Sequence, residues 1–275
     1  MTEKVTIPAL HQMKRDGTKI AGMVAWDTQM AQIVDRAGVD IVSVGDTVGV
    51  NLWGHASPHD VTLDEMVLVG KAVRRGVTRA LMSIDFPSGI LEQGVEAAVQ
   101  AAKRIVDETG ADIVKLDGVA GYPEAITAIH DAGIAVFAQF GITPQTAEKY
   151  GFEYAAISKA GAQIPLEMKD QFVAEAKLLE EAGASLLDIT NSGPVIGEAV
   201  TKAATLPVIG GFGGGPWLDG RMRMSYAAIG YHARAIDSHT ENYANVAKLA
   251  LAAIEDYVGD VRAARQIKGQ APVKV

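Results

Sequence analysis

The segment Asp112-Ile113-Val114-Lys115-Leu116-Asp117-Gly118 carries the pattern that decides the fold. It is a short apolar run that ends in a carboxylate and a glycine, and the helix-period stretch Tyr122–Ala132 follows it. A short apolar run is typical of a buried β-strand, and a helix-period stretch is typical of a helix that covers a sheet. The segment therefore predicts one strand followed by one helix.

The same unit recurs along the chain. Seven apolar runs are predicted as strands, and an eighth, less regular strand is expected near Ala227–Ile236; the seven are Ile20–Ala25, Asp40–Val44, Ala80–Ile84, Asp112–Leu116, Ile134–Phe140, Ser185–Ile189 and Leu206–Gly210. Helices are predicted between and after the runs, among them Gln29–Ala37, Leu91–Glu108, Tyr122–Ala132, Lys169–Ala182 and Asn242–Tyr257.

Eight strand–helix units in about 250 residues are typical of a (β/α)8 TIM barrel, a fold of the α/β class. A doubly wound open sheet is the alternative. Its dinucleotide-binding form is disfavoured because no Gly-x-Gly-x-x-Gly follows the first strand. We expect a single barrel domain over residues 1–275, with a C-terminal helical segment at about 240–260.

Composition excludes several classes of function. The 275 residues are 48% hydrophobic and 21% charged, as in a globular protein with a sizeable core. The formal charge of −8 argues against generic binding to nucleic acid or to an anionic membrane, because both require a positive field. The absence of cysteine excludes disulfides, thiolate zinc sites and a cysteine nucleophile. Neither a signal peptide nor a membrane-spanning segment is evident, so a cytoplasmic protein is expected.

A glycine-rich segment, Gly210-Gly211-Phe212-Gly213-Gly214-Gly215, follows the seventh predicted strand. It lacks the Lys-Ser/Thr pair of a phosphate-binding P-loop. Its backbone N–H groups could bind an anion, or the segment could be a flexible turn, and the sequence leaves both interpretations open.

Five aspartates lie at or near the C-terminal ends of predicted strands: Asp27, Asp46, Asp85, Asp117 and Asp188. In a barrel these ends form one rim, where catalytic residues lie. Asp27 precedes a helical stretch and is interpreted as a helix N-cap. Asp46, Asp85 and Asp117 would repel one another unless a cation or a proton compensated them. Since Mg²⁺ prefers oxygen ligands, a magnesium site is favoured over a purely structural role, although another divalent ion is possible.

Lys115 lies two residues before Asp117, so both side chains share one face of the strand. A lysine among apolar strand residues costs desolvation energy unless it has a partner. Three roles remain open: binding a substrate carboxylate or enolate oxygen, forming a Schiff base as in class I aldolases, or ion pairing within the rim.

Seven segments in order resemble the ketopantoate hydroxymethyltransferase family, Mg²⁺-dependent (β/α)8 enzymes of pantothenate biosynthesis related to the phosphoenolpyruvate mutase and isocitrate lyase group. The resemblance runs from about Val5 to Leu218. It rests on Val5-Thr6-Ile7-Pro8 leading to Met13-Lys14, Val44-Gly45-Asp46-Thr47-Val48-Gly49, Gly54-His55 before Asp60-Val61-Thr62, Ala72-Val73-Arg74-Arg75-Gly76, Val114-Lys115-Leu116-Asp117-Gly118, Gly141-Ile142-Thr143-Pro144-Gln145 and Leu206-Pro207-Val208-Ile209-Gly210.

The resemblance implies roles for individual residues. Asp46 and Asp85 match the two aspartates that hold the metal, and Thr47 matches a serine that contacts the oxo acid. Lys115 matches the substrate-binding lysine. Asp117 stands where the family usually has a glutamate that supports the direct metal ligands, and its side chain is shorter. We include Asp117 in the expected metal site.

The resemblance also implies a reaction. The family transfers a hydroxymethyl group from 5,10-methylenetetrahydrofolate to the 2-oxo acid 3-methyl-2-oxobutanoate. Mg²⁺ chelated by the oxo acid lowers the pKa of the C3 proton, a base removes this proton, and the enolate attacks the one-carbon unit. Family members form homo-oligomers, and the apolar helix Ala247–Ile254 is a candidate interface.

Departures from the family pattern concern proton transfer. Gln139 replaces a histidine, and Thr190 or Asn191 stands where the family has the glutamate proposed as the base. Ser225-Tyr226 replaces a His-Asp pair. Asp188, on the same strand face as Thr190, could serve as the base or pair internally. His55, in the loop after the second strand, is the other candidate base or else a surface residue.

Three hypotheses follow. The chain is expected to be an aldol-type enzyme with catalytic residues Lys115, Asp188, Gln139 and Thr190, and 3-methyl-2-oxobutanoate hydroxymethyltransferase is the activity that the resemblance favours. Alternatively it acts on another 2-oxo acid or acceptor as a lyase or aldolase. The third hypothesis is a non-catalytic, metal-binding homologue. The charged residues at the rim argue against it, because a non-catalytic protein does not need them.

Overall fold

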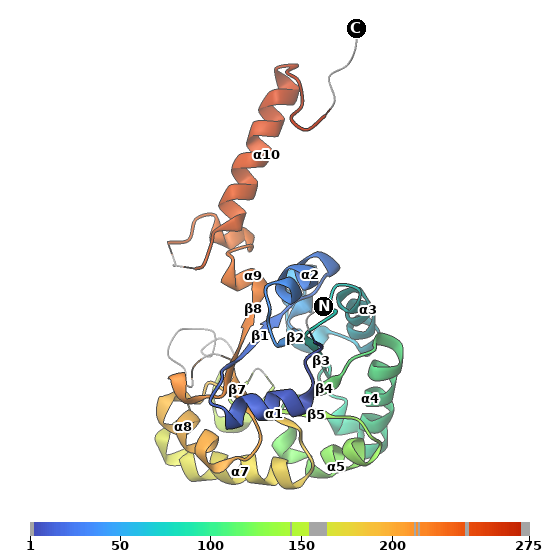
Figure 1. The fold of residues 1–275 in the computed structure, drawn as a ribbon, viewed down its shortest axis with the longest axis vertical. Coiled ribbons are helices and arrows are strands. Elements are labelled where there is room, and N and C mark those ends of the chain that lie inside the picture. Colours follow the sequence, from blue (N-terminus) through green and yellow to red (C-terminus); the bar gives the residue numbers. More distant parts are fainter. Residues whose placement is uncertain are drawn as a thin grey trace. The chain divides into compact units, whose positions relative to one another are not determined.

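The structure is a computed structural model that describes residues 3–143, 145–153, 164–211, 213, 215–239 and 242–270. The chain forms two compact units, Met1–Arg223 and Met224–Val275. Eight parallel strands in chain order form a closed barrel (Figure 1). This confirms the predicted TIM barrel and excludes the open sheet. The expectation of one domain over the whole chain stays a prediction.

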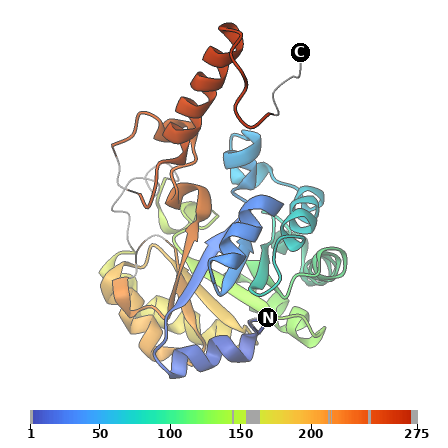
Figure 2. The same cartoon turned by 45° about the horizontal axis from the view of Figure 1, so that its top comes forward.

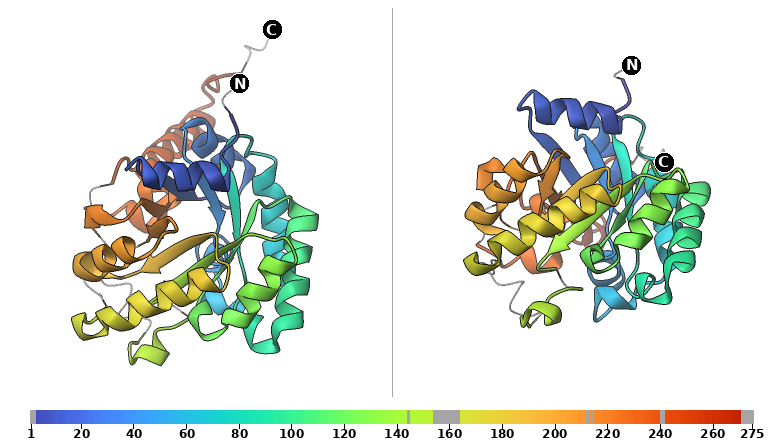
Figure 3. Two further views of the ribbon diagram at one scale, coloured as in Figure 1. Left: turned by 60° about the horizontal axis from the view of Figure 1, so that its bottom comes forward. Right: turned by 90° about the horizontal axis from the view of Figure 1, so that it is seen from below.

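Helices surround the strands of the barrel (Figure 2, Figure 3). The strands are β1 (Ile20–Val24), β2 (Ile41–Val44), β3 (Leu81–Asp85), β4 (Ile113–Leu116), β5 (Val136–Gly141), β6 (Leu186–Thr190), β7 (Val208–Gly210) and β8 (Gly220–Met224). The helices of the first unit are α1 (Ile7–Arg15), α2 (Thr28–Arg36), α3 (Leu63–Arg74), α4 (Val95–Thr109), α5 (Pro123–Asp131), α7 (Lys169–Glu181) and α8 (Gly193–Ala203).

The second unit contains α9 (Ser225–Ala228) and α10 (Val246–Arg262). Asn245 caps α10 by accepting a hydrogen bond from the Lys248 amide at 3.1 Å. No helix in the described part of the chain has both the length and the apolar character needed to cross a bilayer.

The predicted position of the eighth strand was wrong. The segment expected to form it, Ala227–Ile236, overlaps α9 and a short 3-10 turn, whereas β8 is Gly220–Met224. The sequence of β8, GRMRM, alternates apolar and charged residues and leaves Arg221 and Arg223 exposed. A search for continuous apolar runs therefore misses this strand, because only one of its faces is buried.

An apolar layer closes the barrel at the N-terminal ends of the strands. It contains Val5, the α1 residue Leu10 and inward-facing residues of seven strands: Ile20, Ile41, Leu81, Ile113, Phe137, Leu186 and Ile209. Strand side chains alternate between faces, so residues two positions further along point inward as well. On β2 to β6 these residues are polar, namely Ser43, Ser83, Lys115, Gln139 and Asp188. The interior thus changes from apolar to polar towards the C-terminal rim.

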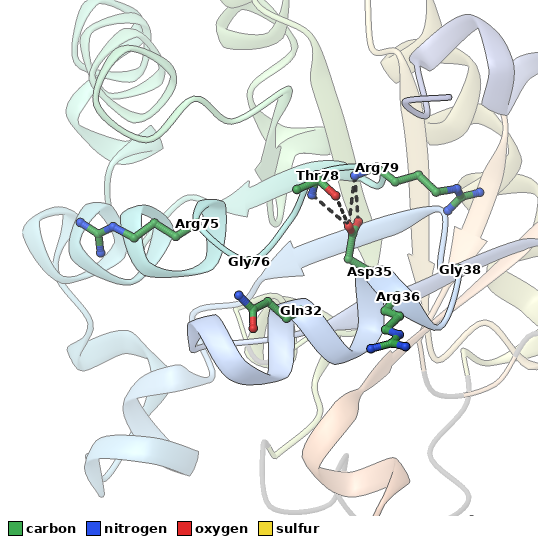
Figure 4. A pocket seen from close by; sticks show the side chains of 8 residues that line it. All are labelled: Gln32, Asp35, Arg36, Gly38, Arg75, Gly76, Thr78 and Arg79. Atoms are coloured by element: carbon green, nitrogen blue, oxygen red, sulfur yellow. Dashed lines mark hydrogen bonds between the residues drawn. The ribbon is translucent and has the colours of Figure 1, made fainter. Parts of the chain in front are cut away.

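A surface pocket of about 520 Å³ lies at the N-terminal end of the barrel (Figure 4). It is lined by residues of α2 and of the turns that lead into β2 and β3. At its centre the Asp35 carboxylate accepts hydrogen bonds from the amides of Thr78, Arg79 and Ala80 at 2.7 to 3.1 Å and from the Thr78 hydroxyl at 2.8 Å. Burial by itself raises the pKa of Asp35, but these hydrogen bonds outweigh it and lower the pKa. Asp35 therefore connects α2 to the turn before β3 through these hydrogen bonds.

Replacing Asp35 with alanine is expected to lower the free energy of unfolding by about 3 kcal/mol, because it leaves backbone amides without acceptors. Urea denaturation of the variant measures this change. Asp170→Ala is the matched control, since its side chain is 94% exposed and its removal should change stability by less than about 0.5 kcal/mol. Equal stability of the two variants would show that the Asp35 hydrogen bonds contribute nothing.

Candidate functional site

Lys115 on β4 is the centre of a buried polar cluster and is only 6% exposed. Its Nζ lies 2.6 Å from Gln139 Oε1, 3.3 Å from Asp188 Oδ2 and 3.5 Å from Asp85 Oδ2. An ammonium group has three hydrogens, so each has an acceptor. Three neighbouring strands, β3, β4 and β5, and the more distant β6 supply these groups.

The charge of Lys115 is stabilised by its surroundings. Burial by itself would lower the pKa of the ammonium, but Asp85 and Asp188 outweigh it and raise the pKa above that of a free lysine. A Schiff base requires the neutral amine. Among the three roles that the sequence left open, the geometry therefore favours ion pairing or binding of an anionic oxygen over a Schiff base.

Gln139 and Thr190 link Lys115 to the second oxygen of Asp188. Gln139 Nε2 donates to Thr190 Oγ1 at 3.0 Å, and Thr190 Oγ1 donates to Asp188 Oδ1 at 3.4 Å. Asp188 is 2% exposed and lies one layer below Thr190 on β6. The four predicted catalytic residues are thus adjacent, and both oxygens of Asp188 have partners.

Asp46 extends this cluster on the side of Asp85. Burial raises the pKa of Asp46 to about 7, and repulsion from Asp85 adds to the effect. Burial also raises the pKa of Asp85, partly offset by Lys115. The absence of a side chain at Gly45 leaves space beside Thr47 and Asp85. A Cβ at this position would lie 3.2 Å from Thr47 Oγ1 and 3.7 Å from Asp85 Oδ2.

Two residues that support these carboxylates had no role in the sequence-based prediction. Ser43 Oγ donates to Asp85 Oδ1, and Gln145 Nε2 donates to Asp46 Oδ2, each at 3.3 Å. Ser43 could have been found from the alternation of β2, since it shares the inward face with Gly45. Gln145 lies in a loop, where no periodicity fixes the direction of a side chain.

Asp117 stands somewhat apart. Its Oδ1 accepts a hydrogen bond from the Gly118 amide at 2.6 Å, and burial raises its pKa to about 7. Within the described ranges, no three histidine, aspartate or glutamate side chains converge as a ready-made metal site. Asp46, Asp85, Asp117 and Asp188 nevertheless surround a single lysine charge. This excess of negative charge fits a divalent cation held by one or two carboxylates and by water, as is usual for Mg²⁺.

Two other predicted residues lie outside the cluster. Asp27 caps α2 by accepting from the Met30 amide at 2.8 Å, as expected. His55 Nε2 is 3.9 Å from Glu65 Oε1, and its ring lies 5.7 Å from the ring of Trp53. None of the contacts described for His55 reaches Lys115 or Asp188. In the glycine-rich segment, Phe212 and Gly214 lie outside the described residues.

Comparison with known proteins identifies relatives over nearly the whole chain. The family model for ketopantoate hydroxymethyltransferase matches residues 4–266. The 3-methyl-2-oxobutanoate hydroxymethyltransferase of Cyanothece sp. is 37% identical over 261 residues, which cover 94% of this chain and 96% of the relative. The enzyme of the same name from Cytophaga hutchinsonii is 33% identical over 260 residues, covering 94% and 93% of the two chains.

Solved structures with low identity share the fold. A phosphonopyruvate hydrolase complex with oxalate and Mg²⁺ superposes with a TM-score of 0.61 at 13% identity, covering 97% of this chain and 91% of the other. A 2,3-dimethylmalate lyase, described as a member of the phosphoenolpyruvate mutase/isocitrate lyase superfamily, gives a TM-score of 0.59 at 13% identity, with 97% and 92% coverage. At this identity the similarity supports the barrel architecture alone.

Proposed function

The chain belongs to the ketopantoate hydroxymethyltransferase family, and from that premise we propose that it is a Mg²⁺-dependent, aldol-type enzyme acting on a 2-oxo acid through an enolate. The activity best supported is transfer of a hydroxymethyl group from 5,10-methylenetetrahydrofolate to 3-methyl-2-oxobutanoate, since relatives carry that name. The observation that carries the proposal is the contact of Lys115 with both Asp85 and Asp188. It joins the proposed metal half of the site to the proposed proton-transfer half.

Asp46 and Asp85 are proposed to hold Mg²⁺ directly, with Asp117 acting on it through water. Bound Mg²⁺ would polarise the 2-oxo group and make the C3 proton of the substrate more acidic. Ser43 and Gln145 orient the two carboxylates through the hydrogen bonds described above. Thr47, which follows Asp46, is proposed to contact the oxo acid.

Asp188 is proposed to accept the C3 proton. Asp188 lies below the rim, so the Thr190 hydroxyl carries the proton inward along its existing hydrogen bond to Asp188 Oδ1. Gln139 fixes the orientation of Thr190 by donating to its oxygen. Neither Gln139 nor Thr190 titrates near neutral pH, which leaves Asp188 as the group in this network that can take up a proton.

Lys115 is proposed to bind the substrate oxyanion and to balance the enolate charge. Of its three contacts, the one to Gln139 is to a neutral acceptor, so a substrate oxygen can replace it at the smallest electrostatic cost. The contacts to Asp85 and Asp188 remain.

Proton NMR of 3-methyl-2-oxobutanoate in D₂O tests the proposal without folate. With enzyme and Mg²⁺, the signal of the C3 proton is expected to disappear, and without Mg²⁺ it should persist. If the signal persists with bound Mg²⁺, this oxo acid is not the substrate. Other 2-oxo acids are then tested in the same assay.

A divergent lyase or aldolase is the second candidate function, favoured by the substitutions at Gln139 and Thr190. A non-catalytic homologue is disfavoured because burying Asp85, Asp188 and Lys115 together costs desolvation energy that a structural protein could avoid. A cytoplasmic homo-oligomer remains part of the proposal on the basis of the family resemblance.

Mg²⁺ is expected to stabilise the fold more at about pH 8 than at about pH 6. The pKa values of Asp46 and Asp117 are each raised to about 7 in the folded protein without metal. At a pH between the ordinary aspartate pKa and 7, the folded protein therefore binds more protons than the unfolded chain. Its free energy of unfolding therefore falls as pH rises through this interval. Mg²⁺ binds the ionised carboxylates, so its effect grows as they deprotonate.

Thermal melting with and without saturating Mg²⁺ measures this dependence. The difference in Tm between the two samples should widen by about 5 °C or more from the lower to the higher pH. NaCl at the same ionic strength separates site binding from general screening. A difference in Tm that is constant with pH would contradict the assignment of these carboxylates to the metal site.

A further inference from the structure

Asn191 follows Thr190 and is the other residue that can be matched to the position of the family's glutamate. Its side chain is buried, with only 2% of the residue exposed, and its Nδ2 donates to the Ile142 carbonyl oxygen at 2.7 Å. Asn191 thus contacts the turn after β5, whereas Thr190 contacts Asp188. The proposed mechanism gives Asn191 no role, so its contacts need a separate explanation.

The backbone conformation of Asn191 is unusual. Its φ is +57°, in the left-handed region that residues other than glycine rarely adopt. Among the residues that the structure describes, Ala264 is the other non-glycine residue with a positive φ. Glycine adopts this φ without strain, and asparagine adopts it at a small cost. What asparagine supplies here, and glycine would not, is the side-chain hydrogen bond to Ile142.

The turn that Asn191 contacts is a compact unit, called here the β5 turn (residues 141–143 and 145–147). The Thr143 amide donates to Thr146 Oγ1 at 2.8 Å, and the Thr146 amide donates to Thr143 Oγ1 at 3.2 Å. The Thr146 hydroxyl in turn donates to the Gly141 carbonyl oxygen at 2.6 Å. Because these bonds lie within the turn, its position on the barrel depends on the groups that attach it.

The end of β6 attaches the β5 turn through both polar groups of the Ile142 backbone. The Ile142 amide donates to the Thr190 carbonyl oxygen at 3.2 Å, and the Ile142 carbonyl accepts the shorter bond from Asn191. The two backbones are in close contact here, since a Cβ on Gly141 would lie 2.5 Å from the Thr190 carbonyl oxygen. Asn191 is therefore the side chain by which β6 holds this turn.

The β5 turn supports two of the carboxylates assigned to the metal site. Gln145 Nε2 donates to Asp46 Oδ2 at 3.3 Å, and the Gln145 amide donates to Thr143 Oγ1 at 3.2 Å, which fixes its backbone within the turn. Burial raises the pKa of Asp117, and a side-chain hydrogen bond from Thr143 partly offsets this rise. A shift of the turn would therefore disturb the surroundings of both Asp46 and Asp117.

We propose that Asn191 is a positioning residue, which fixes the β5 turn on β6 and thereby keeps Gln145 in contact with Asp46. This inference rests on the proposed function, in which Asp46 holds Mg²⁺. The end of β6 then serves both halves of the site, because Thr190 belongs to the proposed proton path and Asn191 orders the support of the metal ligand. Replacing a residue that orients a metal ligand typically weakens metal binding by about 10- to 100-fold.

Calorimetric titration with Mg²⁺ tests this role in Asn191→Gly, which removes the donor and keeps the backbone conformation. We expect the affinity for Mg²⁺ to fall by about three- to tenfold, less than for a direct neighbour of a ligand. Ala264→Gly is the matched control, because it places glycine at the other positive φ on an exposed residue. Its affinity for Mg²⁺ should equal that of the wild type.

A double variant distinguishes positioning from a general loss of stability. Gln145→Ala alone should weaken Mg²⁺ binding by about tenfold. Since Asn191 is proposed to act through Gln145, adding Asn191→Gly should weaken binding by no more than about a further twofold. A residue that only stabilised the fold would lower the affinity by the same factor with or without Gln145.

Hydrogen–deuterium exchange of the metal-free protein is a second readout. The hydrogen-bonded amides of the β5 turn should exchange about tenfold faster in Asn191→Gly, as expected for the loss of one buried hydrogen bond, and at the wild-type rate in Ala264→Gly. Exchange in α4 should be the same in all three proteins, which shows that the barrel remains folded.

Two results would overturn the role of Asn191: wild-type affinity for Mg²⁺ in Asn191→Gly, or full additivity with Gln145→Ala. If the wild type binds no Mg²⁺, the proposed metal function fails, and the exchange rates alone decide whether Asn191 positions the β5 turn. If the wild type binds Mg²⁺ while Asn191→Gly changes neither affinity nor exchange, the role of Asn191 fails and the metal function stands.

Discussion

Replacing Asp188 with asparagine is expected to slow exchange of the substrate C3 proton by about 10³-fold, within the range typical of losing a general base. Asparagine has the same shape and can still accept from Thr190, but its amide N–H₂ then faces Lys115 in place of a carboxylate oxygen, so one of the two contacts of Asp188 is lost. It cannot take up a proton at neutral pH. Exchange measured by NMR in D₂O, on a substrate that the wild type accepts, gives the rate directly.

Oxalate and Mg²⁺ binding serve as controls for Asp188→Asn, because the metal half of the site should remain intact. Thr190→Val tests the path of the proton and is expected to slow exchange by about 10- to 100-fold if the hydroxyl carries it. An exchange rate within about threefold of the wild type in Asp188→Asn would exclude Asp188 as the base. His55→Gln would then test His55, the other candidate base.

Most of the barrel could be predicted from the sequence because six strands, β2 to β7, are buried on both faces, and β1, although partly exposed, is still a continuous apolar run. Such strands appear as continuous apolar runs, and predicted and observed bounds overlap at each of them. β8 could not be found in this way, since its arginines face solvent and its pairing with β7 is limited to Ile209–Gly220 and Gly210–Arg221. Its place depends on closure of the barrel, which is a property of the whole fold.

The candidate site was only partly predictable. Alternation along one strand indicated that Lys115 and Asp117 share a face, but the described ion pairs of Lys115 are with Asp85 and Asp188. These partners are set by the stagger between strands, which places Asp85 opposite Lys115 and Gln139 opposite Asp188. Stagger depends on how the strands tilt when a barrel closes, and no local pattern in the sequence encodes it.

Replacing Lys115 with methionine is expected to lower the free energy of unfolding by about 3 to 5 kcal/mol, because Asp85 and Asp188 would then be buried without a counter-charge. The control is Lys71→Met. Lys71 lies 2.6 Å from Glu108, closer than Lys115 lies to either carboxylate, but its side chain is 41% exposed. An exposed pair contributes at most about 1 kcal/mol, so burial rather than distance should decide which variant loses more.

A double variant separates loss of packing from loss of charge balance. Adding Asp188→Asn to Lys115→Met removes one of the two uncompensated carboxylates, so it should restore at least about a third of the lost stability. Denaturant titrations of the two single variants and the double variant give this coupling. Additive losses would mean that Lys115 stabilises the barrel by filling space rather than by pairing with Asp188. Because the proposed site depends on the contact between Lys115 and Asp188, the coupling also tests the arrangement from which the catalytic role of Asp188 is argued.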